Sequence, residues 1–292
     1  MDSISLFPNI PDSMIEEVYQ DEKANYLIED SKENSKLCVI YFSGHGLFFP
    51  ETTENFRRVI VDENRFEWYK HRFDGTSKSI FVRDICKNFY VEGINSKYDS
   101  VDSLCDFLAK ESAGYEVVTI GSSAGGYAAV LFGCLLKAKR VYSFSGQIDL
   151  WNYFDFPNKK LLQKSREESA KAKYYNLVDL LDSAESTTVV YFTPAHCKED
   201  IYQVEQLRKS SNNKIVLISI KSRRHGVPVL RESLPFVWQL EESELLKAAS
   251  KPMSLLAFTM RCGGGLGVWT MGVTHSVTER IGRRLRRIVS RR

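Results

Sequence analysis

The strongest chemical signal in this sequence is a serine set between two glycines. Gly121-Ser122-Ser123-Ala124-Gly125 places Ser123 in a G-x-S-x-G pattern, after an apolar run and before a stretch of small residues. This context is typical of a nucleophile elbow, a strained strand-to-helix turn that exposes the serine Oγ. Glycines at both ends let the strand and helix approach closely. We predict Ser123 as a nucleophile; the alternative is a glycine-rich turn that only packs a helix on a sheet.

A nucleophilic serine needs a base, and the base needs an acid to orient it. In the elbow architecture the chain order is serine, acid, histidine. His225 directly follows the last strand-like run and is the predicted base, with His196 as the alternative. Asp200 is the predicted acid, with Glu199 as the alternative. Either carboxylate, at the start of a helix, has a second reading as a cap of free N–H groups.

Acyl transfer also needs donors for the developing oxyanion. The backbone N–H of Ala124, at the start of the helix after the serine, is predicted as one donor. The second should come from the turn after an earlier strand, within His45, Gly46 and Leu47. The sequence does not distinguish among these three. The His45 side chain has two other readings, as a substrate contact or as a cap of the turn.

These residues require a scaffold in which strands alternate with helices. The predicted strands are 37–42, 79–82, 115–121, 140–144, 188–192 and 214–220, and the predicted helices are 100–112, 124–137, 199–208 and 230–246. Such alternation predicts an α/β fold with a doubly wound, mostly parallel sheet. Loops at the carboxyl ends of its strands would surround the ligand site.

Two segments depart from this alternation. Residues 150–182 are too long for a simple loop and are predicted to form a small helical lid insertion, or plain surface helices. Residues 251–292 form a basic tail that we expect to be disordered or not part of the fold, so the predicted domain is 1–250. A basic amphipathic pattern near the end of the tail has a further reading, binding to a membrane surface or an anionic polymer.

Composition limits the class of protein. The chain has 292 residues, of which 43% are hydrophobic and 26% charged, which is typical of a globular domain. Its six cysteines show no C-x-x-C spacing, so neither a metal site nor a disulfide framework is expected. The first residues lack a basic region followed by an apolar core, so we expect no signal peptide. No apolar run is long enough to span a membrane, and we predict a cytoplasmic protein.

The charge is unevenly distributed. Residues 251–292 carry nine Lys or Arg and one Glu, a balance of +8, whereas the whole chain carries +3. Residues 1–250 therefore carry −5. An acidic body is a poor match for nucleic acid, so we expect no nucleic-acid partner.

The chain resembles the α/β-hydrolase superfamily over residues 37–246, through the His45-Gly46 turn, the elbow, Asp200 and His225. A finer similarity is to α/β-hydrolase-fold proteins of bacterial capsule and surface-polysaccharide gene clusters. Those proteins show a GSS-x-GG elbow, as residues 121–126 do, and an acid in a helix start similar to residues 200–203. They also show Pro-Gln where this chain has Gly146-Gln147.

The resemblance implies a serine-dependent acyl-transfer enzyme, an esterase or hydrolase of a carboxylic ester or thioester. Because the finer group includes O-acetyltransferases, it also implies an alternative in which acetyl-CoA is the acyl donor and a polysaccharide hydroxyl the acceptor. Otherwise no cofactor is expected. A third hypothesis is a non-catalytic binding or assembly protein of the same fold.

Overall fold

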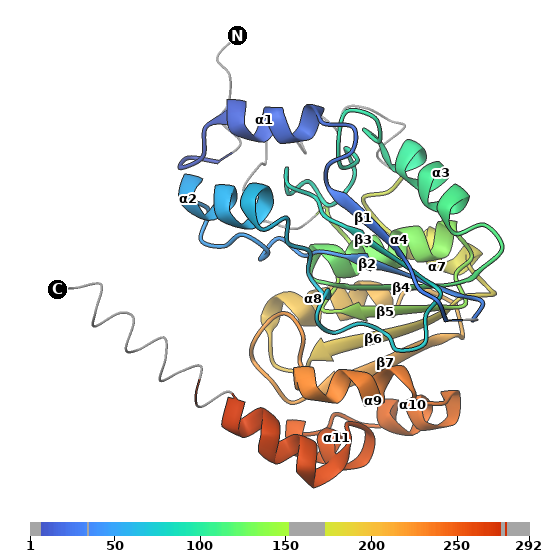
Figure 1. Cartoon of the computed structure of the whole chain (residues 1–292). Coiled ribbons are helices and arrows are strands. Elements are labelled where there is room, and N and C mark those ends of the chain that lie inside the picture. The colour runs from blue at the N-terminus through green and yellow to red at the C-terminus, as the bar shows by residue number, and fades with distance from the viewer. Residues whose placement is uncertain (1–6, 34, 152–172, 276–277, 279–292) are drawn as a thin grey trace.

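The computed structural model describes residues 7–33, 35–151, 173–275 and 278. At its centre lies a sheet with the strand order β1-β3-β2-β4-β5-β6-β7 (Figure 1). The strands are β1 (Tyr26–Asp30), β2 (Leu37–Phe42), β3 (Lys78–Val82), β4 (Glu116–Ser122), β5 (Arg140–Phe144), β6 (Thr188–Pro194) and β7 (Ile215–Ile220). Only β1 runs antiparallel to its neighbour. The predicted doubly wound, mostly parallel sheet is therefore confirmed.

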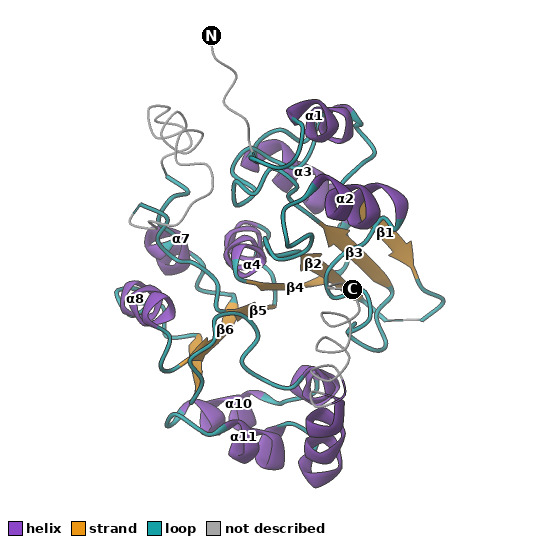
Figure 2. Ribbon diagram, turned by 90° about the vertical axis from the view of Figure 1, so that its left-hand side faces the viewer, coloured by secondary structure: helices purple, strands orange, loops and turns teal. Residues whose placement is uncertain are grey.

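Helices cover both faces of this sheet. They are α1 (Asp12–Gln20), α2 (Thr53–Phe56), η1 (Arg57–Asp62), α3 (Val101–Glu111), α4 (Ala124–Leu135), α7 (Val178–Ser183), α8 (Lys198–Leu207), η2 (Arg231–Ser233), α9 (Leu234–Trp238), α10 (Glu242–Ala249) and α11 (Leu255–Cys262). In Figure 2, α10 and α11 lie across the sheet from α4.

Successive side chains of each strand point to opposite faces of the sheet, so the core has two parts, one on each face. Ile40 and Phe42 on β2 pack with α3 and α4, whereas Val39 and Tyr41 pack on the face covered by α9, α10 and α11. All four side chains are fully buried. Burial on both faces explains why β2 appears in the sequence as a continuous apolar run.

The six predicted strands are all present, but the sequence prediction missed β1. Residues Tyr26–Asp30 form the antiparallel edge of the sheet and are only partly buried, so they lack a strong apolar pattern. The predicted helix over 230–246 is also interrupted. Pro235 lies in the first turn of α9, and a second helix, α10, begins after Glu241, which caps it.

The predicted lid and tail are described only in part. Residues 152–172 of the proposed insertion 150–182 lie outside the described residues. Leu150 and Tyr175, which belong to the described ends of the insertion, are buried in the core.

Residues 251–262, which the sequence assigns to a tail, pack on the sheet. Met253 bridges to Ile220 of β7, and the fully buried Phe258 contacts Phe192 with 5.9 Å between ring centroids. The arginine-rich part, from residue 279 onward, lies outside the described residues.

Candidate active site

Ser123 occupies a strained turn between β4 and α4. Its backbone has φ 53° and ψ −123°, a conformation that costs a non-glycine residue free energy. A Cβ at Gly121 would lie 1.9 Å from the carbonyl oxygen of Gly125, and one at Gly125 would lie 2.3 Å from the carbonyl oxygen of Phe42. Both glycines are thus required by the close approach of strand, turn and helix.

Three side chains predicted from the sequence meet at this turn, and we call Ser123, His225 and Asp200 the candidate triad. The Ser123 Oγ lies 2.8 Å from Nε2 of His225. On the other side of the ring, Nδ1 lies 3.0 Å and 3.2 Å from the two carboxylate oxygens of Asp200. With Nδ1–H donating to Asp200, Nε2 is left to accept the serine proton.

The structure distinguishes between the two predicted acids. Asp200 is 1% exposed and contacts His225, whereas Glu199 is exposed to solvent. Both are in the first turn of α8, which Gln203 anchors because its Oε1 accepts the N–H groups of Ile148 and Asp149 at 2.7 Å and 2.9 Å. This attachment to the loop after β5 orients α8 so that Asp200 faces the histidine.

The electrostatic surroundings favour a proton on His225. Burial alone would lower the pKa of this imidazole, but the hydrogen bond and charge of Asp200, with a further contribution from Glu199, outweigh burial and raise it above its ordinary value. A raised pKa makes the ring a stronger base.

The turn at residues 43–47, which we call the oxyanion turn, follows β2 beside the elbow. Its Leu47 N–H donates to the Gly44 carbonyl at 3.3 Å, and the Gly44 N–H donates to a carboxylate oxygen of Glu67 at 2.6 Å. Among the described residues, no acceptor is found for the N–H of His45 or Gly46. Of the three predicted candidates, these two therefore remain available as oxyanion donors, and Leu47 does not.

On the elbow side, the predicted donor is Ala124. It is the first residue of α4, so its N–H has no acceptor within the helix.

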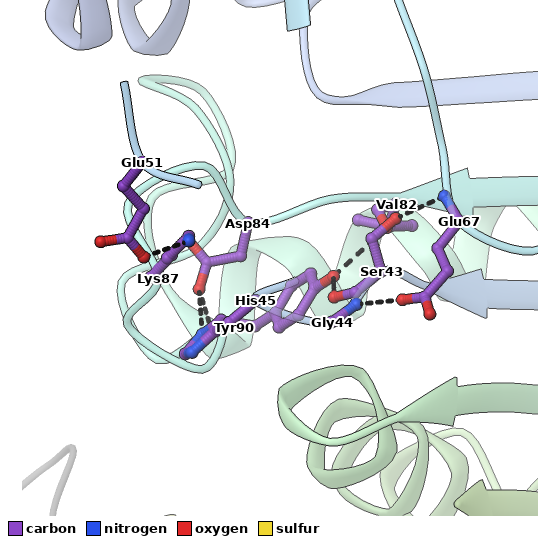
Figure 3. A network of polar contacts seen from close by, with 9 residues as sticks. All are labelled: Ser43, Gly44, His45, Glu51, Glu67, Val82, Asp84, Lys87 and Tyr90. Carbon is purple, nitrogen blue, oxygen red and sulfur yellow. Dashed lines mark hydrogen bonds and ion pairs between the residues drawn. The ribbon is translucent and has the colours of Figure 1, made fainter. Parts of the chain in front are cut away.

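The His45 side chain packs into the protein. Its ring lies 4.5 Å from that of Phe89, and its Nε2 lies 3.9 Å from Oδ2 of the buried Asp84 (Figure 3). Burial lowers the pKa of His45, with Asp84 opposing the shift. The ring therefore packs the turn against the protein, as in the prediction of a residue that holds the turn.

A cavity of about 830 Å³ lies beside the candidate triad. Its walls include Gly46 of the oxyanion turn, Ser122 and Gly226, which adjoin Ser123 and His225 in sequence. Residues 63–71 form another wall. The cavity thus reaches the oxyanion turn directly and approaches Ser123 and His225 through their chain neighbours Ser122 and Gly226, while the three triad residues are not among its lining.

Two site residues have no signal in the sequence. Glu67 lies between the buried aromatic residues Phe66 and Trp68, in a segment without a recognisable motif. The Ser145 hydroxyl donates to the Gly226 carbonyl at 2.8 Å, which holds the loop that carries His225. A single acid or serine in a loop is too common to be identified without its spatial neighbours.

His196, the alternative base, lies just after β6, where its N–H donates to the carbonyl of Ser222.

In the described part of the chain, no three His, Cys, Asp or Glu side chains are grouped to hold a metal ion. No helix among the same residues is long and apolar enough to cross a membrane.

Comparison with known proteins finds similarity only among solved structures. No protein-family model and no curated protein matches it. Among solved structures, the capsule O-acetyltransferase of Neisseria meningitidis serogroup A is 15% identical, with 66% of this chain and 82% of that chain covered and a TM-score of 0.48.

Two other solved structures give lower scores. MenH from S. aureus is 11% identical, with 67% and 89% of the two chains covered and a TM-score of 0.40. An α/β hydrolase from the metagenome of lagoon sediments at Mar Chica is 16% identical, with 68% and 86% covered and a TM-score of 0.38.

The fold assignment therefore rests on the chain's own architecture. Its parallel sheet has one antiparallel edge strand, helices on both faces, and a strand–turn–helix elbow at Ser123. The chain has the α/β-hydrolase fold.

Proposed function

We propose that this protein is a serine-dependent acyl-transfer enzyme that acts on a carboxylic ester or thioester. The observation that carries the proposal is the unbroken hydrogen-bonded chain from the Ser123 Oγ through the His225 ring to Asp200. The strained serine, the free backbone donors beside it and the adjacent cavity support the same assignment.

In the first half-reaction, the Ser123 Oγ bonds to the carbonyl carbon while His225 Nε2 takes the hydroxyl proton. The N–H groups of Ala124 and of His45 or Gly46 stabilise the negative charge on the carbonyl oxygen. The C–O or C–S bond to the leaving group then breaks, and His225 returns the proton to the leaving alkoxide or thiolate. An ester on Ser123 remains.

In the second half-reaction, an acceptor hydroxyl loses its proton to His225 and attacks this ester. Ser123 leaves and is reprotonated by the imidazolium. Water as acceptor makes the enzyme a hydrolase, and a sugar hydroxyl makes it a transferase. Both reactions use the same residues.

Labelling with a fluorophosphonate probe tests the nucleophile. We expect the wild-type protein to be labelled and Ser123→Ala to be unlabelled. Ser112→Ala should be labelled at the wild-type rate, because Ser112 follows α3 and the one hydrogen bond it loses is that of its hydroxyl to the Leu108 carbonyl. An unlabelled wild-type protein would instead favour the non-catalytic binding protein.

The transferase alternative rests on the elbow and helix-start residues that resemble those of the polysaccharide-cluster proteins. Two of these residues also have local roles, since Tyr202 and Gln203 both bond Asp149. They therefore do not by themselves distinguish a sugar acceptor from water. Incubation with acetyl-CoA, with and without a polysaccharide, separates the two. Acetate release that no polysaccharide alters would exclude the transferase.

A further inference from the structure

The carboxylate of Glu67 joins the two halves of the oxyanion site. One of its oxygens accepts the Gly44 N–H at 2.6 Å, and the other accepts the Ser122 hydroxyl at 3.1 Å. Gly44 belongs to the oxyanion turn, and Ser122 directly precedes the predicted nucleophile. One side chain therefore bridges the two segments whose N–H groups must converge on one oxyanion.

These two segments are in close contact at the bridge. A Cβ at Gly44 would lie 2.7 Å from the Ser122 carbonyl oxygen. Small displacements of the turn would thus change its distance from the elbow. Catalysis by oxyanion donors is sensitive to such displacements, since a misplacement of about 1 Å costs on the order of 100-fold in rate.

The position of Glu67 is itself well determined. Its N–H donates to the Ser43 Oγ at 3.1 Å, and the adjacent side chains of Phe66 and Trp68 are buried. The buried guanidinium of Arg83 donates to the carbonyl of Arg65 at 3.0 Å, which holds the preceding residues. The segment that carries the carboxylate is thus held at both Arg65 and Glu67.

The oxyanion turn is held from its other side by Tyr90. The Tyr90 hydroxyl donates to the Ser43 carbonyl at 2.7 Å, while Glu67 accepts from the next residue, Gly44. Figure 3 shows Tyr90 and Glu67 on opposite sides of the turn. In the described part of the chain, the N–H groups of His45 and Gly46 have no acceptor and can bind a ligand.

Burial disfavours the charged form of the Glu67 carboxylate. Burial raises the pKa of Glu67, and its bonds to Gly44 and Ser122 offset the shift in part. A carboxylate taken from water must be compensated by strong hydrogen bonds, and here these come from the two segments that it joins.

We propose that Glu67 is a positioning residue that sets the distance between the oxyanion turn and the nucleophile elbow through Gly44 and Ser122. This role rests on the proposed acyl-transfer function. Glu67 also lines the cavity, but both of its oxygens are bonded to the two segments, to Gly44 and to Ser122, which assigns it to positioning rather than to the reaction itself. Its loss is expected to lower kcat while leaving KM nearly unchanged, because the oxyanion develops only in the transition state.

Steady-state hydrolysis of an activated ester by four variants tests this role. We expect Glu67→Ala to lower kcat roughly 10- to 100-fold with KM within about threefold. Glu67→Gln keeps an oxygen that can accept the Gly44 N–H, so it should restore most of kcat. Ser122→Ala keeps the Gly44 contact but loses the link to the elbow and should lower kcat about threefold to tenfold. Glu116→Ala should match the wild type, because Glu116 lies at the start of β4, at the other end of the strand from Ser122, and among the described residues its carboxylate is paired only with Lys139.

A second measurement detects the contact without relying on activity. Only two Ser-Gly pairs occur in the sequence, Ser43-Gly44 and Ser145-Gly146. Cell-free synthesis with carbonyl-¹³C serine and ¹⁵N glycine therefore isolates two amide signals by NMR. We expect the Gly44 proton far downfield, moving upfield in Glu67→Ala but little in Glu67→Gln, with Gly146 as the internal reference.

The outcomes separate the two proposals. Labelled wild-type protein together with an unchanged kcat in Glu67→Ala or Ser122→Ala would overturn the positioning role alone. So would a raised KM at constant kcat, which would make Glu67 a substrate contact. If Glu67→Ala does not fold, a low kcat in Glu67→Gln with the Gly44 signal unmoved would overturn it as well. An unlabelled wild-type protein overturns the acyl-transfer function and this role with it, whatever the Gly44 signal shows.

Discussion

The candidate triad and the oxyanion turn lie side by side, yet they are held in different ways. Each triad residue lies on a loop or helix start directly after a parallel strand, and its type and chain order identify it. The oxyanion turn is held instead by Glu67 and Tyr90, from segments 23 and 47 residues away that carry no motif. Groups that react are limited to a few residue types, whereas any suitable donor or acceptor can position a turn.

Among the substitutions that test this comparison, removing the base should lower kcat most. We expect His225→Ala to lower kcat by roughly 10⁴- to 10⁶-fold, because among the described residues only His225 is bonded to the Ser123 hydroxyl and placed to accept its proton. Ester hydrolysis under saturating substrate measures this loss. His196→Ala should retain nearly full activity. A comparable loss of kcat in His196→Ala would contradict His225 as the base.

Removing the charge of the acid should have the next largest effect. Asp200→Asn keeps the shape of the side chain but presents the wrong partner to Nδ1, and kcat should fall on the order of 10⁴-fold. Glu199→Gln, one residue away and exposed, should stay within about threefold at a pH well above the His225 pKa. Reversed effects in these two variants would exchange their roles.

Weakening the support of the oxyanion turn should have a smaller effect. Tyr90→Phe leaves the buried Ser43 carbonyl without its donor, at a cost of about 1–3 kcal/mol in the free energy of unfolding. We expect kcat to fall only severalfold, since Glu67 still holds the turn. Chemical denaturation and ester hydrolysis measure the two effects. A loss as large as that of His225→Ala would remove the distinction between reacting and positioning groups.

The pH dependence should give the smallest but most specific effect. The base must be neutral, so kcat/KM falls as the pH drops through the His225 pKa. Because Asp200 and Glu199 raise this pKa, the acid limb should lie above the ordinary value of 6.5. In Glu199→Gln it should move slightly to lower pH, and in Asp200→Asn further in the same direction. A limb that moves upward in either variant would contradict these electrostatic assignments.

Much of the fold was predictable because its signals are local. Fully buried parallel strands appear as short apolar runs, and six of the seven described strands were identified in this way. The edge strand β1 was not, because its side chains are partly exposed. Met253 and Phe258 were assigned to a tail, because no local pattern shows that β7 offers them a surface.

By itself, the sequence determined the residue types that can react, their order along the chain and the alternation that predicts a parallel sheet. These properties depend on composition and on periods of two to four residues. The tertiary structure decided which of two adjacent acids faces His225 and which N–H groups of the oxyanion turn stay free. It alone placed Glu67 between Gly44 and Ser122. Such choices depend on distances between segments far apart in the chain, and those distances exist only after the sheet has formed.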